Sequence, residues 1–133
     1  MTVKSMEIKI NTNKNFEIID ITSKINNLID VEEGIVTVFS RHSTSAIVVN
    51  ENEKGLLNDL EFMLGNLVSD KFTYEHDRID DNAKSHLKSF LLSSSETIPI
   101  KNHKLDLGTW QSVFFVELDG PRSNRTINLT IMG

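Results

Sequence analysis

The sequence contains no cysteine among its 133 residues, and it has only two prolines and six glycines. Without cysteine the chain forms neither disulfides nor thiolate metal sites, so a bound metal has to be held by histidine, carboxylate or carbonyl groups. No apolar stretch approaches the roughly 18 residues of a membrane-spanning helix, and the N-terminus lacks the apolar run of a signal peptide. We therefore expect a cytoplasmic protein with no membrane partner.

Positive charge is also scarce, since 14 Lys and Arg residues face 19 Asp and Glu residues and the net charge is −5. A negative chain has little general affinity for nucleic acid, because that affinity depends on basic surfaces. The hydrophobic and charged fractions, 38% and 25%, are those of an ordinary globular protein. With no repeat and no linker, the length predicts one domain over residues 1–133 that does not bind nucleic acid.

The hydrophobic pattern predicts an α+β fold, mostly an antiparallel β-sheet or sandwich with two main helices. Residues 6–10 alternate between apolar and polar, and short β-branched runs occupy 35–39 and 46–49. Helical spacing appears weakly over 21–29 and strongly over 56–67, and again from Asn82 to Leu91. Residues 97–100 read as an edge strand, and strands over 110–118 and 126–131 are joined by a turn at Asp119–Arg122.

Histidines are the best metal ligands that this chain has. His42 lies among hydroxyl residues, His76 precedes an acidic segment, and His86 falls on the last predicted helix. Imidazoles from separate elements can converge on one divalent metal, with nearby carboxylates fixing their tautomers. The spacing matches no short zinc signature. The residues alone therefore also allow a plainer interpretation, in which Asp81 or Asn82 caps a helix, His86 is half-buried beside it and His76 is a loop residue.

Other polar residues allow a binding role and a plainer structural one. Asn50 and Glu51 follow a strand and precede a helix, where Glu51 suits acid–base work and both suit a turn or helix start. Arg122 and Arg125 suit a phosphate, or simply an exposed hairpin end. Trp110 suits a ring-binding pocket, or the core.

Several ordered segments resemble a known family. These are His42–Ala46 with Val49–Asn52, Tyr74–His76, Asp80–Lys88, Leu107–Gln111, and Glu117 with Asp119–Arg122. Together they are similar to the motifs of the YjbQ-like proteins, described as secondary thiamin-phosphate synthases. Glu53–Lys54 stand where relatives usually have Ala-Asp. His103 stands where relatives tend to have a turn glycine, which predicts a loop residue with positive φ.

The resemblance implies a homotrimer with a metal, expected to be zinc, held by His42, His76 and His86. It also implies an enzyme that joins a pyrimidine methyl diphosphate to a thiazole phosphate, giving thiamin phosphate and pyrophosphate. For this reaction Arg122 and Arg125 are candidates to stabilise the diphosphate, with Asn50 and Trp110 as further candidate contacts to a small phosphorylated substrate. For a hydrolase or lyase reaction, Glu51 or Asp81 is the candidate proton acceptor.

The chemistry leaves other functions open. Departure of a diphosphate is commonly assisted by magnesium on oxygen ligands, whereas three imidazoles suit zinc or another transition metal. The synthase reaction is therefore expected as a side activity of a site built for another substrate. The alternatives are a metal-dependent hydrolase or lyase acting on a small phosphorylated compound, and a trimeric metal- or ligand-binding protein without catalysis.

Overall fold

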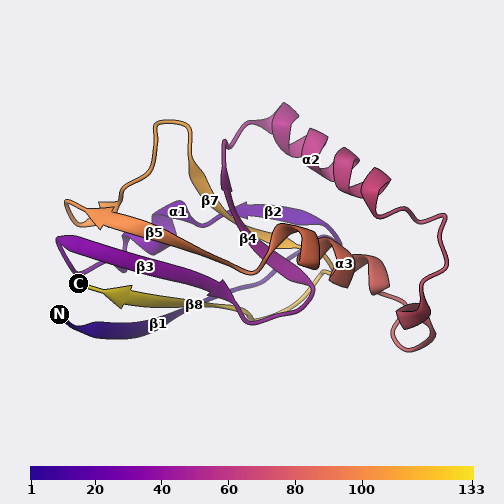
Figure 1. Cartoon of the computed structure of the whole chain (residues 1–133), viewed down its shortest axis with the longest axis horizontal. Coiled ribbons are helices and arrows are strands. Elements are labelled where there is room, and N and C mark those ends of the chain that lie inside the picture. Colours follow the sequence, from indigo (N-terminus) through magenta and orange to yellow (C-terminus); the bar gives the residue numbers. More distant parts are fainter.

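A computed structural model describes residues 1–133 as two antiparallel sheets packed face to face (Figure 1). The larger sheet has the order β1-β8-β3-β5-β6, and the smaller has the order β2-β7-β4. The strands of the two sheets are β1 (Val3–Ile10), β2 (Glu17–Asp20), β3 (Glu33–Ser40), β4 (Ser45–Asn50), β5 (Ser95–Lys101), β6 (Lys104–Leu105), β7 (Ser112–Glu117) and β8 (Arg125–Met132). The helices are α1 (Thr22–Asn26), α2 (Lys54–Leu67) and α3 (Ala83–Leu92), with the short 3₁₀ turn η1 (Glu75–Arg78).

The main core lies between the two sheets, and the period-2 pattern of the strands fills it. Alternate residues of β8, such as Ile127, Leu129 and Ile131, are buried, and their neighbours face outward. Ile47 and Phe115 meet them from the smaller sheet. The two chain ends lie side by side, because Thr2 and Gly133 exchange two backbone hydrogen bonds. The predicted α+β class with antiparallel strands and two main helices is confirmed.

Strand β7 is buried on both faces within one chain. Val113 to Val116 are all at most 1% exposed. Val113 and Phe115 point into the main core, whereas Val116 packs in a second cluster with Ala46 and Leu118 on the outer face of the smaller sheet. The apolar run in β7 is therefore satisfied without another subunit.

Both main helices form where the sequence predicts them, but their apolar stripes are not buried as that prediction implies. Leu64 is the only buried residue of α2, and in α3 only Ala83 and Ser85 are buried. Phe62 and Phe90 are 74% and 85% exposed. In Figure 1, α2 stands clear of the strands. No helix is long and apolar enough to cross a membrane.

Two local features follow directly from residue chemistry. Glu53, one of the residues that differ from the family pattern, caps α2 by accepting hydrogen bonds from the backbone N–H groups of Gly55 (2.7 Å) and Leu56 (2.9 Å). Such a cap satisfies donors that the first helical turn cannot pair. His103 lies in the β5–β6 turn with φ of 64°, which confirms the predicted loop position.

Candidate functional site

Two of the three candidate histidines line one hollow of about 310 Å³ between the β3–β4 loop and α3. His42 comes from the loop and His86 from the helix. Hydroxyl groups dominate the rest of the wall, which consists of Ser43, Ser89, Phe90, Ser93 and Ser94. His86 also lines a neighbouring hollow of about 430 Å³, which contains His76. His86 therefore stands between the other two histidines.

His76 and His86 are in direct contact. Their ring centroids lie 4.8 Å apart with the rings nearly perpendicular, at 86°. Two imidazoles bound to one metal at roughly 2.0–2.1 Å in tetrahedral geometry have centroids about 5 Å apart. The Nε2 atom of His76 is buried and has no hydrogen-bond partner, and Asp80 Oδ2 lies 3.9 Å from it. An unpaired buried nitrogen beside a second imidazole and a carboxylate suits a divalent transition metal.

His42 is held differently. Its Nε2 accepts a 2.8 Å hydrogen bond from the backbone N–H of Thr126, so the ring proton of the neutral form lies on Nδ1. Burial lowers the pKa of His42, and the positive charge of Arg125 lowers it further, although Glu117 acts in the opposite direction. His42 is therefore neutral near pH 7, as a metal ligand has to be.

Within one chain, no three histidine or carboxylate side chains are grouped so as to hold a metal ion. The structure brings His76 and His86 together and places His42 across the hollow from His86. The predicted set of three is thus a contacting pair and one separate ring.

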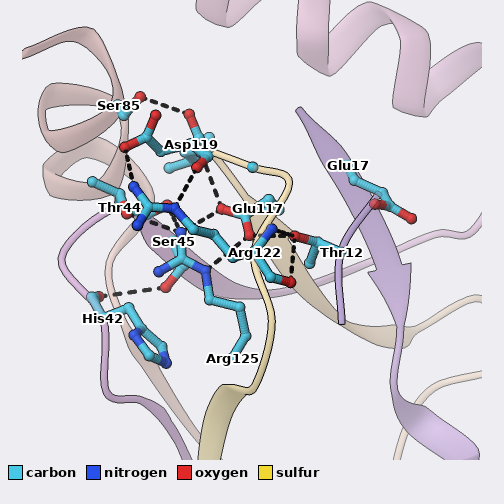
Figure 2. Close-up of polar contacts among 12 residues, drawn as sticks. Thr12, Glu17, His42, Thr44, Ser45, Ser85, Glu117, Asp119, Arg122 and Arg125 are labelled. Atoms are coloured by element: carbon cyan, nitrogen blue, oxygen red, sulfur yellow. Dashed lines mark hydrogen bonds and ion pairs between the residues drawn. The ribbon is translucent and has the colours of Figure 1, made fainter. Parts of the chain in front are cut away.

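Arg125 lies in a buried ion pair with Glu117 (Figure 2). Arg125 donates from Nε to Glu117 Oε1 (2.8 Å) and from Nη2 to Oε2 (2.5 Å), and the two side chains are 5% and 0% exposed. Its Nη2 also donates to Thr44 Oγ1 (2.9 Å). The predicted exposed hairpin end is wrong for Arg125, and these contacts direct its guanidinium to groups of its own chain.

Glu117 is paired on both oxygens. Thr12 donates its hydroxyl to Oε1 at 2.7 Å, and the backbone N–H of Asp119 donates to Oε2 at 3.0 Å. Burial alone would raise the pKa of Glu117, but the hydrogen bonds from Arg125, Thr12 and Asp119 outweigh it and lower the pKa below its ordinary value. Glu117 is therefore ionised at neutral pH and matches the charge of Arg125.

The turn after β7 connects this pair to the start of α3. Asp119 accepts from Asn82 Nδ2 and from Arg122 Nη2, both at 2.9 Å, and the hydroxyl of Ser85 donates to the carbonyl of Leu118 at 2.6 Å. Arg122 is half exposed and bound to Asp119. The sequence suggested Asp81 or Asn82 as the helix cap, but the N–H of Ala83 donates to Asp77 Oδ1 instead.

The remaining candidate residues lie outside the histidine hollow. Asn50 and Glu51 line a separate, mainly apolar hollow of about 300 Å³ beneath α2. Asp81 is exposed in a left-handed conformation with φ of 55°. Trp110 is 72% exposed and precedes β7, so neither the predicted strand start nor a core position is correct for it.

Sequence reasoning missed Glu117 and Thr44 as the buried partners of Arg125, and Thr12 as a further partner of Glu117. One signal was available in the sequence. Glu117 directly follows the apolar run of β7, and a carboxylate that continues a buried strand needs a partner for its charge. The contact to Thr12 joins residues far apart in the chain and left no local pattern.

The sequence and the fold match known proteins over nearly the whole chain. A model of the UPF0047 YjbQ-like proteins matches residues 6–133. The chain belongs to the YjbQ-like family. A UPF0047 protein of Methanothermobacter thermautotrophicus is 49% identical over all of this chain and 94% of its own length. The UPF0047 protein YugU of Bacillus subtilis is 31% identical over 98% of this chain and 99% of its own.

Solved structures of YjbQ-like proteins have the same fold. A YbjQ-like protein of unknown function from Sulfolobus solfataricus superposes with a TM-score of 0.95 at 38% identity, covering 99% of this chain and 98% of that one. A YjbQ/UPF0047 family protein from Clostridium acetobutylicum gives 0.89 at 34% identity, covering 96% of this chain and 99% of that one. These comparisons establish family and fold, and their names assign neither an activity nor a metal.

Proposed function

We propose that the chain is a metal-dependent enzyme that binds a divalent transition metal, preferably zinc, through His76 and His86, with His42 as the third ligand. The unpaired, buried Nε2 of His76 against the ring of His86 carries this proposal. His42 Nε2 accepts the Thr126 N–H in this structure, so ligation through that nitrogen would require this hydrogen bond to be released. We place the enzyme in the cytoplasm.

The substrate class in this proposal is a small phosphorylated compound. The hollow carries mostly hydroxyl and imidazole groups, which donate hydrogen bonds to phosphate oxygens. Burial is the largest cause of the lowered pKa of His42, and the positive charges of Arg125, Arg41 and Arg122 lower it further against the opposite effect of Glu117, although the whole chain is negative. A positive field over hydroxyl donors favours an anion.

The reaction that we propose follows the family resemblance, and we assign it as a side activity. The thiazole nitrogen forms a bond to the pyrimidine methylene carbon while the carbon–oxygen bond to diphosphate breaks, giving thiamin phosphate and pyrophosphate. A divalent metal would supply Lewis-acid stabilisation of the departing diphosphate, and magnesium would serve that role if the diphosphate substrate binds as its magnesium complex. Ser43, Ser93 and Ser94 orient the anion by hydrogen bonding.

The two candidate proton acceptors occupy other places. Glu51 lines the hollow under α2, and Asp81 is exposed before α3. Neither lines the histidine hollow of its own chain. In this proposal they therefore contribute less to turnover than the histidines do.

We expect the purified, zinc-loaded protein to form thiamin phosphate from the two substrates, to lose the activity on chelation and to regain it with added zinc. Activity should fall as the pH drops through the histidine range, because protonated imidazoles release the metal. Product is measured by chromatography after oxidation to a fluorescent thiochrome. Retention of turnover after complete zinc removal contradicts the proposal.

A matched set of variants separates the possible functions. Glu51→Gln should retain most of the activity, whereas His86→Ala should abolish it and His103→Ala should leave it intact. If the metal-loaded protein turns over neither these substrates nor other small phosphate esters, the binding function without catalysis replaces the enzymatic one.

We propose that the chain forms a homotrimer with two further copies of itself. Strand β7 needs no such cover, but one chain leaves many large apolar side chains exposed around α2, α3 and the loops: Phe62, Met63, Leu67, Phe72, Ile79, Phe90, Leu91 and Trp110. Such surface is more than a small soluble monomer usually leaves to water. We expect light scattering at micromolar concentration to give three times the chain mass of 15.1 kDa. A 15 kDa monomer contradicts the trimer.

A further inference from the structure

The buried Arg125–Glu117 pair has bonded contacts toward both walls of the histidine hollow. On one side, Arg125 Nη2 donates to the hydroxyl and the carbonyl of Thr44, at 2.9 and 3.3 Å, two residues after His42. Thr126, the residue after Arg125, donates its N–H to His42. The N–H of Arg41 also donates to the carbonyl of Thr126 at 3.3 Å, so four hydrogen bonds join the start of β8 to the loop that carries His42.

On the other side, Glu117 orders the turn that supports α3. Its Oε2 accepts from the N–H of Asp119, and the Asp119 carboxylate accepts from Asn82, directly before the helix. The carbonyl of Leu118 accepts from Ser85, one residue before His86. Hydrogen bonds through the ion pair thus link the His42 loop to the start of α3 (Figure 2). Beside them, the N–H of Leu118 donates directly to the carbonyl of Thr44 at 3.1 Å, and the hydroxyl of Ser89 donates to the carbonyl of Ser45 at 2.6 Å.

A buried ion pair of this kind contributes little net stability to a fold. Both side chains are at most 5% exposed, and removing two charges from water consumes most of what their attraction returns. An apolar pair of the same volume often stabilises a fold as well, so such a pair suggests another role. Its bonding directions are fixed by the bidentate geometry of a guanidinium against a carboxylate.

We propose that Arg125 and Glu117 are positioning residues that set the placement of His42 relative to His86. This inference rests on the proposed metal site for its functional meaning, but the placement itself is measurable without a metal. Groups that are hydrogen-bonded behind metal ligands typically change metal affinity by roughly 10–100-fold when they are lost. We expect a loss of metal affinity of the same size for each substitution that removes a hydrogen bond between the ion pair and either histidine-bearing segment.

The chain offers a matched pair of variants for the test. Thr44→Val removes the hydroxyl that accepts the shorter of the two hydrogen bonds from Arg125 to Thr44, and leaves the carbonyl that accepts the longer one. Thr12→Val removes the other threonine hydroxyl of the network, which donates to Glu117 Oε1, accepts from the backbone N–H of Arg122 and makes no hydrogen bond to the His42 loop. Both threonines are buried, at 6% and 4% exposure, so both variants lose a buried hydrogen bond to the same ion pair.

The first readout is titration with Co²⁺ alone, followed by its visible absorption, which reports coordination geometry. Thr44→Val and Asn82→Ala should weaken Co²⁺ binding by roughly 10–100-fold and change the spectrum. Thr12→Val should bind Co²⁺ as the unmodified protein does, and Thr44→Ser should restore its affinity. Equal Co²⁺ affinity in Thr44→Val and the unmodified protein, or equal losses in Thr44→Val and Thr12→Val, overturns the positioning role.

The second readout needs no metal. Hydrogen exchange of the Thr126 amide, which donates to His42, should quicken roughly tenfold in Thr44→Val, about the effect of one weakened hydrogen bond, and stay unchanged in Thr12→Val. Unchanged exchange in Thr44→Val overturns the inference even if no form of the protein binds Co²⁺. Failure of the unmodified protein to bind Co²⁺ overturns the proposed metal site, and the exchange rates then still decide the positioning role.

Discussion

Replacing Arg125 by Met is expected to destabilise the fold by about 3–5 kcal/mol, because it leaves the carboxylate of Glu117 buried without its counter-charge. The pair is closed to solvent, and Arg125 supplies two of the hydrogen bonds to that carboxylate. Glu117→Gln combined with Arg125→Met should recover about 2 kcal/mol of that loss, because a neutral amide needs no cation and still accepts a hydrogen bond. Urea unfolding measures the free energy of unfolding of the unmodified protein, of Arg125→Met, of Glu117→Gln and of the double variant.

The matched control is Arg122→Met. Arg122 forms an ion pair with Asp119 in which its own side chain is half exposed, so its loss should cost only about 0–1 kcal/mol. If the loss of stability in Glu117→Gln/Arg125→Met equals the sum of the losses in Glu117→Gln and in Arg125→Met, the two residues are not coupled. That result contradicts the description of Arg125 and Glu117 as one buried unit.

The pair also determines how stability responds to acid. The folded-state pKa of Glu117 lies below its ordinary value, so the stability from its ionised form is present above the unfolded pKa. That stability is lost as the pH falls through the folded pKa. The Glu117→Gln/Arg125→Met protein should therefore lose less free energy of unfolding between neutral pH and acid than the unmodified protein.

Loss of either contacting histidine is the second large effect. His76→Ala and His86→Ala should each weaken Co²⁺ binding by more than the roughly 10–100-fold that loss of a supporting group costs, because each removes a ligand itself. His103→Ala, in an exposed turn, should bind Co²⁺ unchanged. Isothermal titration measures the affinities. Equal affinity in His86→Ala and His103→Ala contradicts the site.

Much of the sheet was predictable, because alternation along strands such as β1 and β8 reflects one buried face directly. The positions of α2 and α3 were predictable for the same kind of reason. Their packing was not, since helical spacing identifies an apolar face but not what covers it. Leu64 alone of the α2 stripe is buried, and Phe90 of α3 faces solvent.

The site was predictable only in part. The motifs singled out His42, His76 and His86, but they did not show that His76 and His86 would touch while His42 is held by a backbone N–H. Arg125 showed the limit of local reading most clearly. Beside turn residues it resembled an exposed hairpin end, and only the fold brings Glu117 and Thr44 to it. Long-range pairs of this kind leave no spacing signal in a single sequence.

Anomalous diffraction at the zinc edge, from crystals soaked in zinc, tests the central claim most directly. The account predicts a peak roughly 2.0–2.1 Å from a ring nitrogen of both His76 and His86, on the side of the hollow that His42 faces. A soaked crystal with no zinc at these two rings, or with zinc bound only elsewhere, such as at His103, contradicts it.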